Sequence, residues 1–182
     1  IMRRVFFSFH YKNDNWRVQT IKNIGVVDNQ IPVYSNEWEE VRLKRADKIK
    51  EWIDENIIGC SCLVVLIGEE TANREWVLYE IEKAWNDGKG VMGIYIHNLE
   101  DNNGNTSARG DNPFNLFRFS QPFLSLNIPV YAYNPLRTIV DFTNPNKKES
   151  QKWYEQIKQH LADWVEEAIE YRSTHNYMIT RR

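Results

Sequence analysis

Residues 62–85 read CLVVLIGEETANREWVLYEIEKAW and combine two patterns that decide the fold. Cys62–Ile67 is a continuous apolar run ended by Gly68, which is typical of a strand buried on both faces. From Asn73 onward the apolar residues recur at helical spacing, until Asp87–Gly88 ends the pattern. A buried strand followed at once by an amphipathic helix is the repeating unit of parallel α/β proteins.

The same alternation continues on both sides of this stretch. Asp14 is expected to cap the first helix, and Pro32 limits a short second strand, somewhere in 26–34, to an edge of the sheet. The other expected strands are 5–9, 91–97 and 130–133, and the other expected helices are 16–24, 41–58 and 149–171.

This order predicts a three-layer α/β sandwich, with a central, mainly parallel sheet flanked by helices. We expect one domain over residues 1–182, with a long loop at about 98–127 and a C-terminal helix at about 149–171.

Composition narrows the class of function. The 182 residues are 42% hydrophobic and 26% charged, with a net charge of −2. That balance lacks the basic excess that nucleic-acid binding needs, so no nucleic-acid partner is expected. The five basic residues of 42–50 lie among acidic ones and indicate a solvated helix face.

Other patterns are missing from the sequence. There is no long apolar segment, so neither a membrane span nor a signal peptide is expected. Cys60 and Cys62 are interpreted as reduced core residues, which favours a cytoplasmic protein. The sequence has no spacing typical of metal ligands, no dinucleotide-binding glycine motif and no P-loop.

Glu80 breaks the apolar pattern of the 73–85 helix. At about 100° per residue, Glu80 falls roughly 40° from Trp76, inside the arc of Val77, Ile81 and Ala84. A carboxylate there is costly unless it is paired, hydrogen-bonded or open to a cleft. Two interpretations stay open on geometry alone, namely a structural or rim carboxylate and a carboxylate held in a cleft to act on a substrate.

Ligands of open parallel sheets bind at the carboxyl ends of the strands. The residues that follow the first strand, Ser8, Phe9, His10 and Tyr11, are therefore candidates for a binding site. A lone histidine after a strand is more often structural than catalytic, so His10 carries both interpretations.

These stretches resemble Toll/interleukin-1 receptor (TIR) domains. VFFSFH at 5–10 is similar to their opening strand, and Trp76 with Glu80 matches the W-x-x-x-E helix. The ordered set of VFFSFHY, WEE at 38–40, LIG, NREWVLYEI and GDNPF at 110–114 most resembles the TIR proteins of the bacterial Thoeris antiphage system, of the ThsB type. The resemblance covers roughly residues 4–135.

The resemblance implies a flavodoxin-like fold and an NAD+-consuming enzyme, of the NAD+ glycohydrolase or ADP-ribosyl cyclase type. NAD+ is then the substrate, and no cofactor or metal is needed. It implies Glu80 as the catalytic residue and a substrate-binding set. That set is Ser8, Phe9, His10, Tyr11, Trp38 and Trp76.

Breaking the ribose–nicotinamide bond would yield a cyclic or modified ADP-ribose, a diffusible signal that activates a separate effector protein. We expect a phage-derived trigger or self-assembly into a homo-oligomer to control the activity. Two alternatives remain, a non-catalytic TIR adaptor and a nucleoside-processing enzyme of the deoxyribosyltransferase kind. Residues 26–36 depart from the usual TIR pattern, which leaves the mode of assembly open.

Overall fold

The computed structural model describes residues 3–22, 32–34, 45–121, 123–132 and 147–182. Its centre is a five-stranded sheet in the order β2-β1-β3-β4-β6, in which every neighbouring pair is parallel. The strands are β1 (Val5–Ser8), β2 (Pro32–Tyr34), β3 (Cys62–Ile67), β4 (Gly90–Tyr95) and β6 (Val130–Tyr131).

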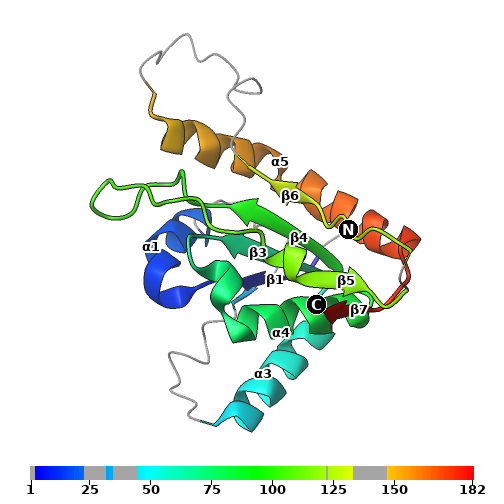
Figure 1. The fold of residues 1–182 in the computed structure, drawn as a ribbon. Coiled ribbons are helices and arrows are strands. Elements are labelled where there is room, and N and C mark those ends of the chain that lie inside the picture. Colours follow the sequence, from blue (N-terminus) through cyan, green and yellow to red (C-terminus); the bar gives the residue numbers. More distant parts are fainter. Residues whose placement is uncertain (1–2, 23–31, 35–44, 122, 133–146) are drawn as a thin grey trace.

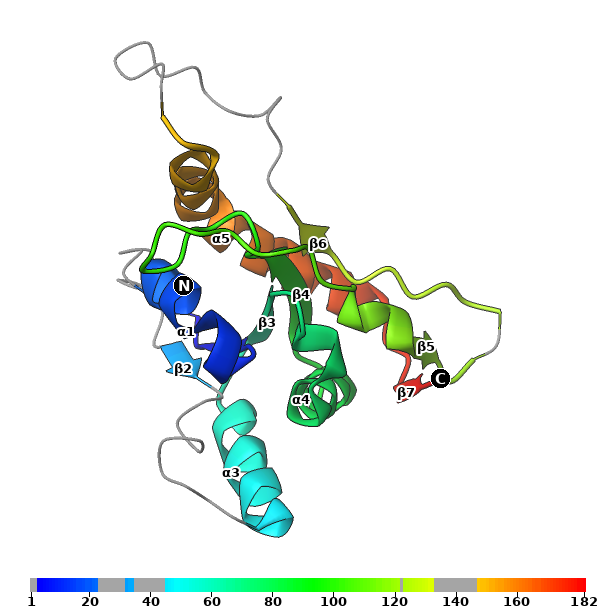
Figure 2. The ribbon, with the colours of Figure 1, turned by 60° about the vertical axis from the view of Figure 1, so that its left-hand side comes forward.

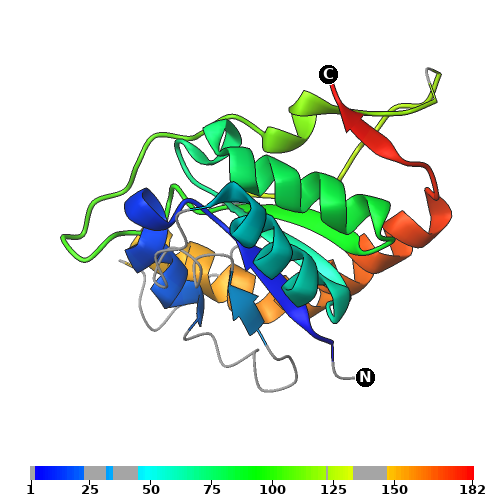
Figure 3. The same cartoon turned by 90° about the horizontal axis from the view of Figure 1, so that it is seen from below.

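Helices cover both faces of this sheet (Figure 1). On one face lie α3 (Ala46–Ile58) and α4 (Glu75–Asn86), which lie in front of the strands in the view of Figure 3. On the other face lie α1 (Tyr11–Lys22) and the long α5 (Glu149–Thr174) (Figure 2). The expected three-layer α/β sandwich with a mainly parallel sheet is confirmed.

Two apolar clusters fill the spaces between these layers, because neighbouring residues of a strand point to opposite faces. In β3, Leu63, Val65 and Ile67 pack in the cluster of the α3/α4 face. Cys62, Val64 and Leu66 pack in the cluster of the α1/α5 face. The central strand is therefore buried on both sides, as its continuous apolar run predicts.

The sequence patterns predict the positions of several helices and strands correctly. β3 has its predicted bounds, α4 ends at Asn86 just before the predicted stop, and β2 is an edge strand, as Pro32 requires. The helix expected over 41–58 is described from Ala46, with Ile49, Ile53 and Ile57 buried as its apolar stripe. Its first residues, 41–44, lie outside the described part of the chain.

The prediction for the first helix is wrong. α1 begins at Tyr11, directly after β1, and Asp14 is a buried residue inside it and not its cap. The helix starts earlier because the chain turns at His10, whose carbonyl accepts a hydrogen bond from the Asp14 amide at 3.0 Å.

A second sheet was not predicted. It pairs β5 (Phe117–Phe119), preceded by the short helix η3 (Pro113–Leu116), with the C-terminal strand β7 (Ile179–Arg181) in antiparallel fashion. The segment before and along β7 lies on α4. There the Trp85 indole donates to the Tyr177 carbonyl at 2.7 Å, and Asn86 exchanges two hydrogen bonds with Ile179.

Candidate functional site

Glu80 is a buried carboxylate on α4, with only 1% of its surface exposed. It lies among Val77, Ile81 and Ala84, which are buried as the helical arc predicts. The Ser8 hydroxyl, at the end of β1, donates a hydrogen bond to Glu80 Oε2. This hydrogen bond fixes the Glu80 carboxyl group at the carboxyl end of the sheet.

The position of this pair in the sheet is one at which ligands bind. β1 lies between β2 and β3, so the chain leaves β1 to one side of the sheet and leaves β3 to the other. In flavodoxin-like sheets the ligand crevice opens at this switch point, beyond the carboxyl ends of the strands. Ser8 is the last residue of β1, which puts the Ser8–Glu80 pair at the switch point.

Trp76 lies one helical turn before Glu80 and is half-buried. Its ring meets the Tyr79 ring edge-to-face, with centroids 6.2 Å apart, and Tyr79 donates a hydrogen bond to Asp54 of α3 at 2.8 Å. α3 therefore supports the side of α4 that carries Trp76. Trp76 and Glu80 are four residues apart and therefore lie on the same side of α4.

The residues after β1 divide between the two faces. Ser8 faces α4, whereas Phe9 is 4% exposed and packs in the cluster of the α1/α5 face, with its ring centroid 6.5 Å from that of Tyr11. The alternation of side chains along a strand explains this split. Among the described candidates, Ser8 and Trp76 come near Glu80, Phe9 and Tyr11 turn to the other face, and Trp38 lies outside the described residues.

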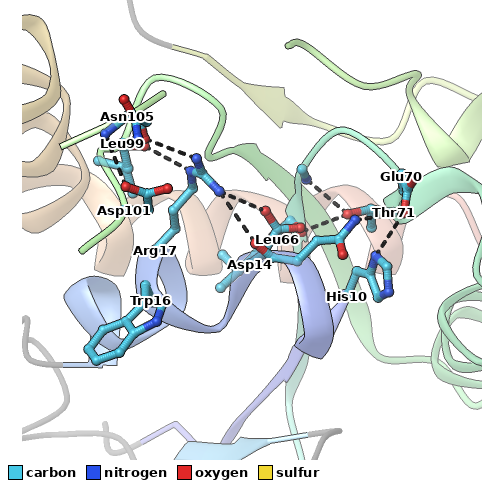
Figure 4. A network of polar contacts seen from close by, with 12 residues as sticks. His10, Asp14, Trp16, Arg17, Leu66, Glu70, Thr71, Leu99, Asp101 and Asn105 are labelled. Carbon is cyan, nitrogen blue, oxygen red and sulfur yellow. Dashed lines mark hydrogen bonds and ion pairs between the residues drawn. The ribbon is translucent and has the colours of Figure 1, made fainter. Parts of the chain in front are cut away.

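His10 lies at the junction of β1 and α1 and is 5% exposed. Its Nδ1 is 3.6 Å from Glu70 Oε2, and the same carboxylate oxygen accepts a hydrogen bond from Asn13 Nδ2 at 2.6 Å (Figure 4). Burial lowers the pKa of His10, and the positive charge of Arg74 lowers it further. The imidazole is therefore neutral at neutral pH.

The sequence did not predict the polar network that surrounds Arg17 of α1 (Figure 4). Arg17 is buried and donates to the carbonyl oxygens of Leu99 at 2.9 Å and Asn105 at 3.1 Å. Its guanidinium also lies 3.5 Å from Asp14 Oδ1. These contacts fasten the loop after β4 to α1, and Asp101 stabilises the loop by accepting from the Asn103 and Asn105 amides.

Two glycines let the backbone approach this network closely. A Cβ on Gly68, at the end of β3, would overlap Asp14 Oδ2, and a Cβ on Gly110 would overlap the Gly68 carbonyl oxygen. The loop after β4 therefore crosses directly over the end of β3. Burial raises the pKa of Asp14 to about 6, although Arg17 acts against the shift.

Within the described ranges, no group of three or more His, Cys, Asp or Glu side chains is placed to hold a metal ion. None of the helices in the described part of the chain is long and apolar enough to cross a membrane.

A parallel sheet of this order, covered by helices on both faces, defines a flavodoxin-like α/β protein. More narrowly, the chain belongs to the family of the Thoeris protein ThsB, TIR-like domain, whose model matches residues 6–101.

A relative with a similar sequence carries a ThsB name. A relative from Bacillus cereus (strain MSX-D12), named "Putative cyclic ADP-D-ribose synthase ThsB1", is 35% identical over 123 residues. The match covers 62% of this chain and 61% of the length of the relative. The TIR domains of the activated Roq1 resistosome directly recognizing the pathogen effector XopQ align over 94% of this chain and 80% of that chain, with 14% identity and a TM-score of 0.41.

Proposed function

We propose that this chain is an NAD+-consuming enzyme that breaks the ribose–nicotinamide bond and releases a cyclic or otherwise modified ADP-ribose. The observation that carries the proposal is the buried Glu80 carboxylate, held by Ser8 at the switch point of a ThsB-family TIR protein. The name of the Bacillus cereus relative, a cyclic ADP-D-ribose synthase, supports the same substrate class.

The chemistry suits a fixed negative charge. When the bond breaks, its electron pair leaves with nicotinamide, which becomes neutral, and positive charge develops on the ribose at C1′ and its ring oxygen. A carboxylate fixed beside the ribose stabilises that charge without having to reorganise. Water, adenine or a hydroxyl group then attacks C1′ and loses a proton, and that choice decides the product.

The aromatic wall has a separate role in the proposal. Trp76 would stack on the nicotinamide ring and exclude water from one side of the ribose. Exclusion of water matters most for a cyclase, because water competes with the internal nucleophile. The product would act as a diffusible signal for a separate effector protein, and a phage-derived trigger or self-assembly would switch the enzyme on.

The test is to incubate the purified chain with NAD+, with and without lysate from phage-infected cells, and to follow nicotinamide and the second product by liquid chromatography and mass spectrometry. Glu80→Gln should lower nicotinamide release by about 10²–10³. Glu82→Gln makes the same chemical change on the outer side of α4 and should leave it unaffected.

Each other outcome decides between functions. Equal nicotinamide release by Glu80→Gln and the unsubstituted chain would remove the proposed role of Glu80. Release from neither sample would favour the adaptor function, and Glu80 would then be a buried structural carboxylate. Cleavage of deoxynucleosides in place of NAD+ would indicate a deoxyribosyltransferase-like enzyme.

A further inference from the structure

Two helices begin close to the Ser8–Glu80 pair, one on each side of the switch point. α1 starts at Tyr11 directly after β1, and its first turn carries the exposed side chain of Lys12. α4 starts at Glu75, directly after the half-buried Arg74. Helix N-termini carry partial positive charge and backbone N–H donors, so each of them favours an anion.

His10 links these two helix starts. It is 5% exposed, and its Nδ1 makes no hydrogen bond to any of the described residues. Besides burial, the charges of Arg74 and of Lys12 lower the pKa of His10. Lys12 follows His10 by two residues in the first turn of α1, and Arg74 directly precedes α4, so each of the two helix starts carries one cation.

A carboxylate of the chain itself lies beside His10, between the two helix starts. The Glu70 carboxylate, from the turn after β3, accepts from Asn13 Nδ2 at 2.6 Å and lies 3.6 Å from His10 Nδ1 (Figure 4). Its side chain is 57% exposed, so it is free to rotate into water at little cost. The neighbouring Glu69 is exposed too, and Asp14 is buried behind the first turn of α1.

We propose that this anion position, formed by His10, Lys12, Asn13 and Arg74, binds the diphosphate of a dinucleotide, and that the Glu70 carboxylate holds it in the ligand-free chain. Carboxylate and phosphate oxygens accept the same hydrogen bonds and attract the same cations. Glu70 is thus an internal competitor that the substrate displaces. The choice of NAD+ as the dinucleotide rests on the proposed function.

The spacing along the chain fits such a ligand. Ser8, which holds Glu80, and His10 are two residues apart, which is roughly 7 Å of extended backbone. A ribose and the phosphate attached to it span a similar length. NAD+ can therefore place its nicotinamide ribose at Glu80 and its diphosphate at the first turn of α1, with both groups at the carboxyl edge of the sheet.

The test measures binding without turnover, by isothermal titration calorimetry of the full chain with inorganic pyrophosphate and with ADP-ribose. Glu70→Gln removes the competing charge but keeps an amide that Asn13 can contact, so affinity should rise roughly three- to tenfold. Lys12→Gln with Arg74→Gln should weaken it by about tenfold or more. Lys48→Gln, on the exposed side of α3, is the matched control and should change nothing.

Lys12 is exposed, so Lys12→Gln alone should weaken binding about three- to fivefold, and it keeps the test valid if the double variant fails to fold. Unchanged or weaker binding by Glu70→Gln, or unchanged binding by the Lys12 variants, would overturn the inference. So would the absence of pyrophosphate binding by both the unsubstituted chain and Glu70→Gln.

A kinetic comparison separates this inference from the proposed function. Nicotinamide riboside has the bond to be broken but no phosphate. Turnover of NAD+ by the Lys12 and Arg74 variants should show a raised KM, whereas turnover of nicotinamide riboside should be unaffected. If the enzyme is active but the Lys12 and Arg74 variants leave its KM for NAD+ unchanged, the diphosphate site is refuted and the proposed function stands. If the chain binds pyrophosphate as expected but releases no nicotinamide, the proposed function is refuted and the diphosphate site stands.

Discussion

Glu80 and Asp14 are buried carboxyl groups of nearly equal exposure, 1% and 2%, on opposite faces of the same sheet. Glu80 accepts from the hydroxyl of Ser8, beside the switch point of the sheet. Asp14 packs against Gly68 and lies beside Arg17, which also donates to the Leu99 and Asn105 carbonyls in the loop after β4. Burial alone therefore does not identify a catalytic carboxylate. The catalytic role proposed for Glu80 and the structural role of Asp14 are distinguished by the groups that surround each acid.

The largest expected difference between the two acids is in turnover. Glu80→Gln should lower nicotinamide release from NAD+ by about 10²–10³, because the amide carries no charge to stabilise the ribose cation. Asp14→Asn should change it by less than about threefold, because Asp14 is held among groups that fasten a loop. The measurement is the initial rate of nicotinamide release, together with circular dichroism to verify the fold of both variants.

A loss of turnover of similar size in Asp14→Asn would mean that the network on α1 also shapes the reacting site. In that case the separation of the two acids into catalytic and structural groups would be wrong.

The two acids also show which buried carboxyl groups a local sequence pattern can predict. Glu80 could be located from the sequence because α4 has a regular apolar arc, and one charged residue inside such an arc stands out. Asp14 could not, because aspartate before an apolar stretch is a common helix cap. Its actual environment depends on Gly68, 54 positions away in the sequence, which lies against it only in the folded chain.

The same limit applies to the small sheet. β5 and β7 have three residues each and pair across some 60 positions, so neither has a local pattern long enough to stand out. A weak signal exists in Phe117–Phe119, where an exposed arginine stands between two buried rings. Of the residues proposed for the site, the sequence indicated Glu80, Ser8 and Trp76. It gave no local signal for the competitor role that we propose for Glu70, because carboxylates on exposed turns are common.

The structural role of the α1 network predicts a stability effect of Arg17→Met. This change leaves Asp14 buried without its cation and removes the donors to the Leu99 and Asn105 carbonyls. The free energy of unfolding should fall by about 3 kcal/mol, measured by urea denaturation. Hydrogen exchange of the Ser107 amide, which donates to the His97 carbonyl, should become faster.

Arg45→Met is the control, since Arg45 is 77% exposed and pairs with the surface residue Asp47, and its effect should be below about 0.5 kcal/mol. An equal effect of both substitutions would show that Arg17 does not fasten the loop.

The pKa of Asp14 predicts a pH dependence of stability. Burial raises this pKa from 3.8 to about 6, so between these values the folded chain keeps a proton that the unfolded chain has released. Stability contributed by this group therefore falls as pH rises through that window, by about 3 kcal/mol in total. Asp14→Asn should remove that fall, which urea denaturation at pH 4.5, 5.5 and 6.5 would detect as a difference from the unsubstituted chain.

Parallel stability curves for the two proteins would mean that Asp14 titrates normally and that its burial costs less than the surrounding contacts imply. Asp14 would then be buried without a raised pKa, and its burial would not distinguish it from an ordinary carboxyl group.

The smallest expected effect concerns the hydroxyl that holds Glu80. We expect Ser8 to act on the reaction by holding the Glu80 carboxyl group through its hydroxyl. Ser8→Ala should lower kcat by about tenfold and leave KM unchanged, because a net hydrogen bond to a charged group is worth about 1.5 kcal/mol or more. It should also move the acidic limb of the pH–rate profile to higher pH, since the ionised carboxylate loses a donor. A raised KM with an unmoved pH profile would instead make Ser8 a substrate contact, as the sequence first indicated.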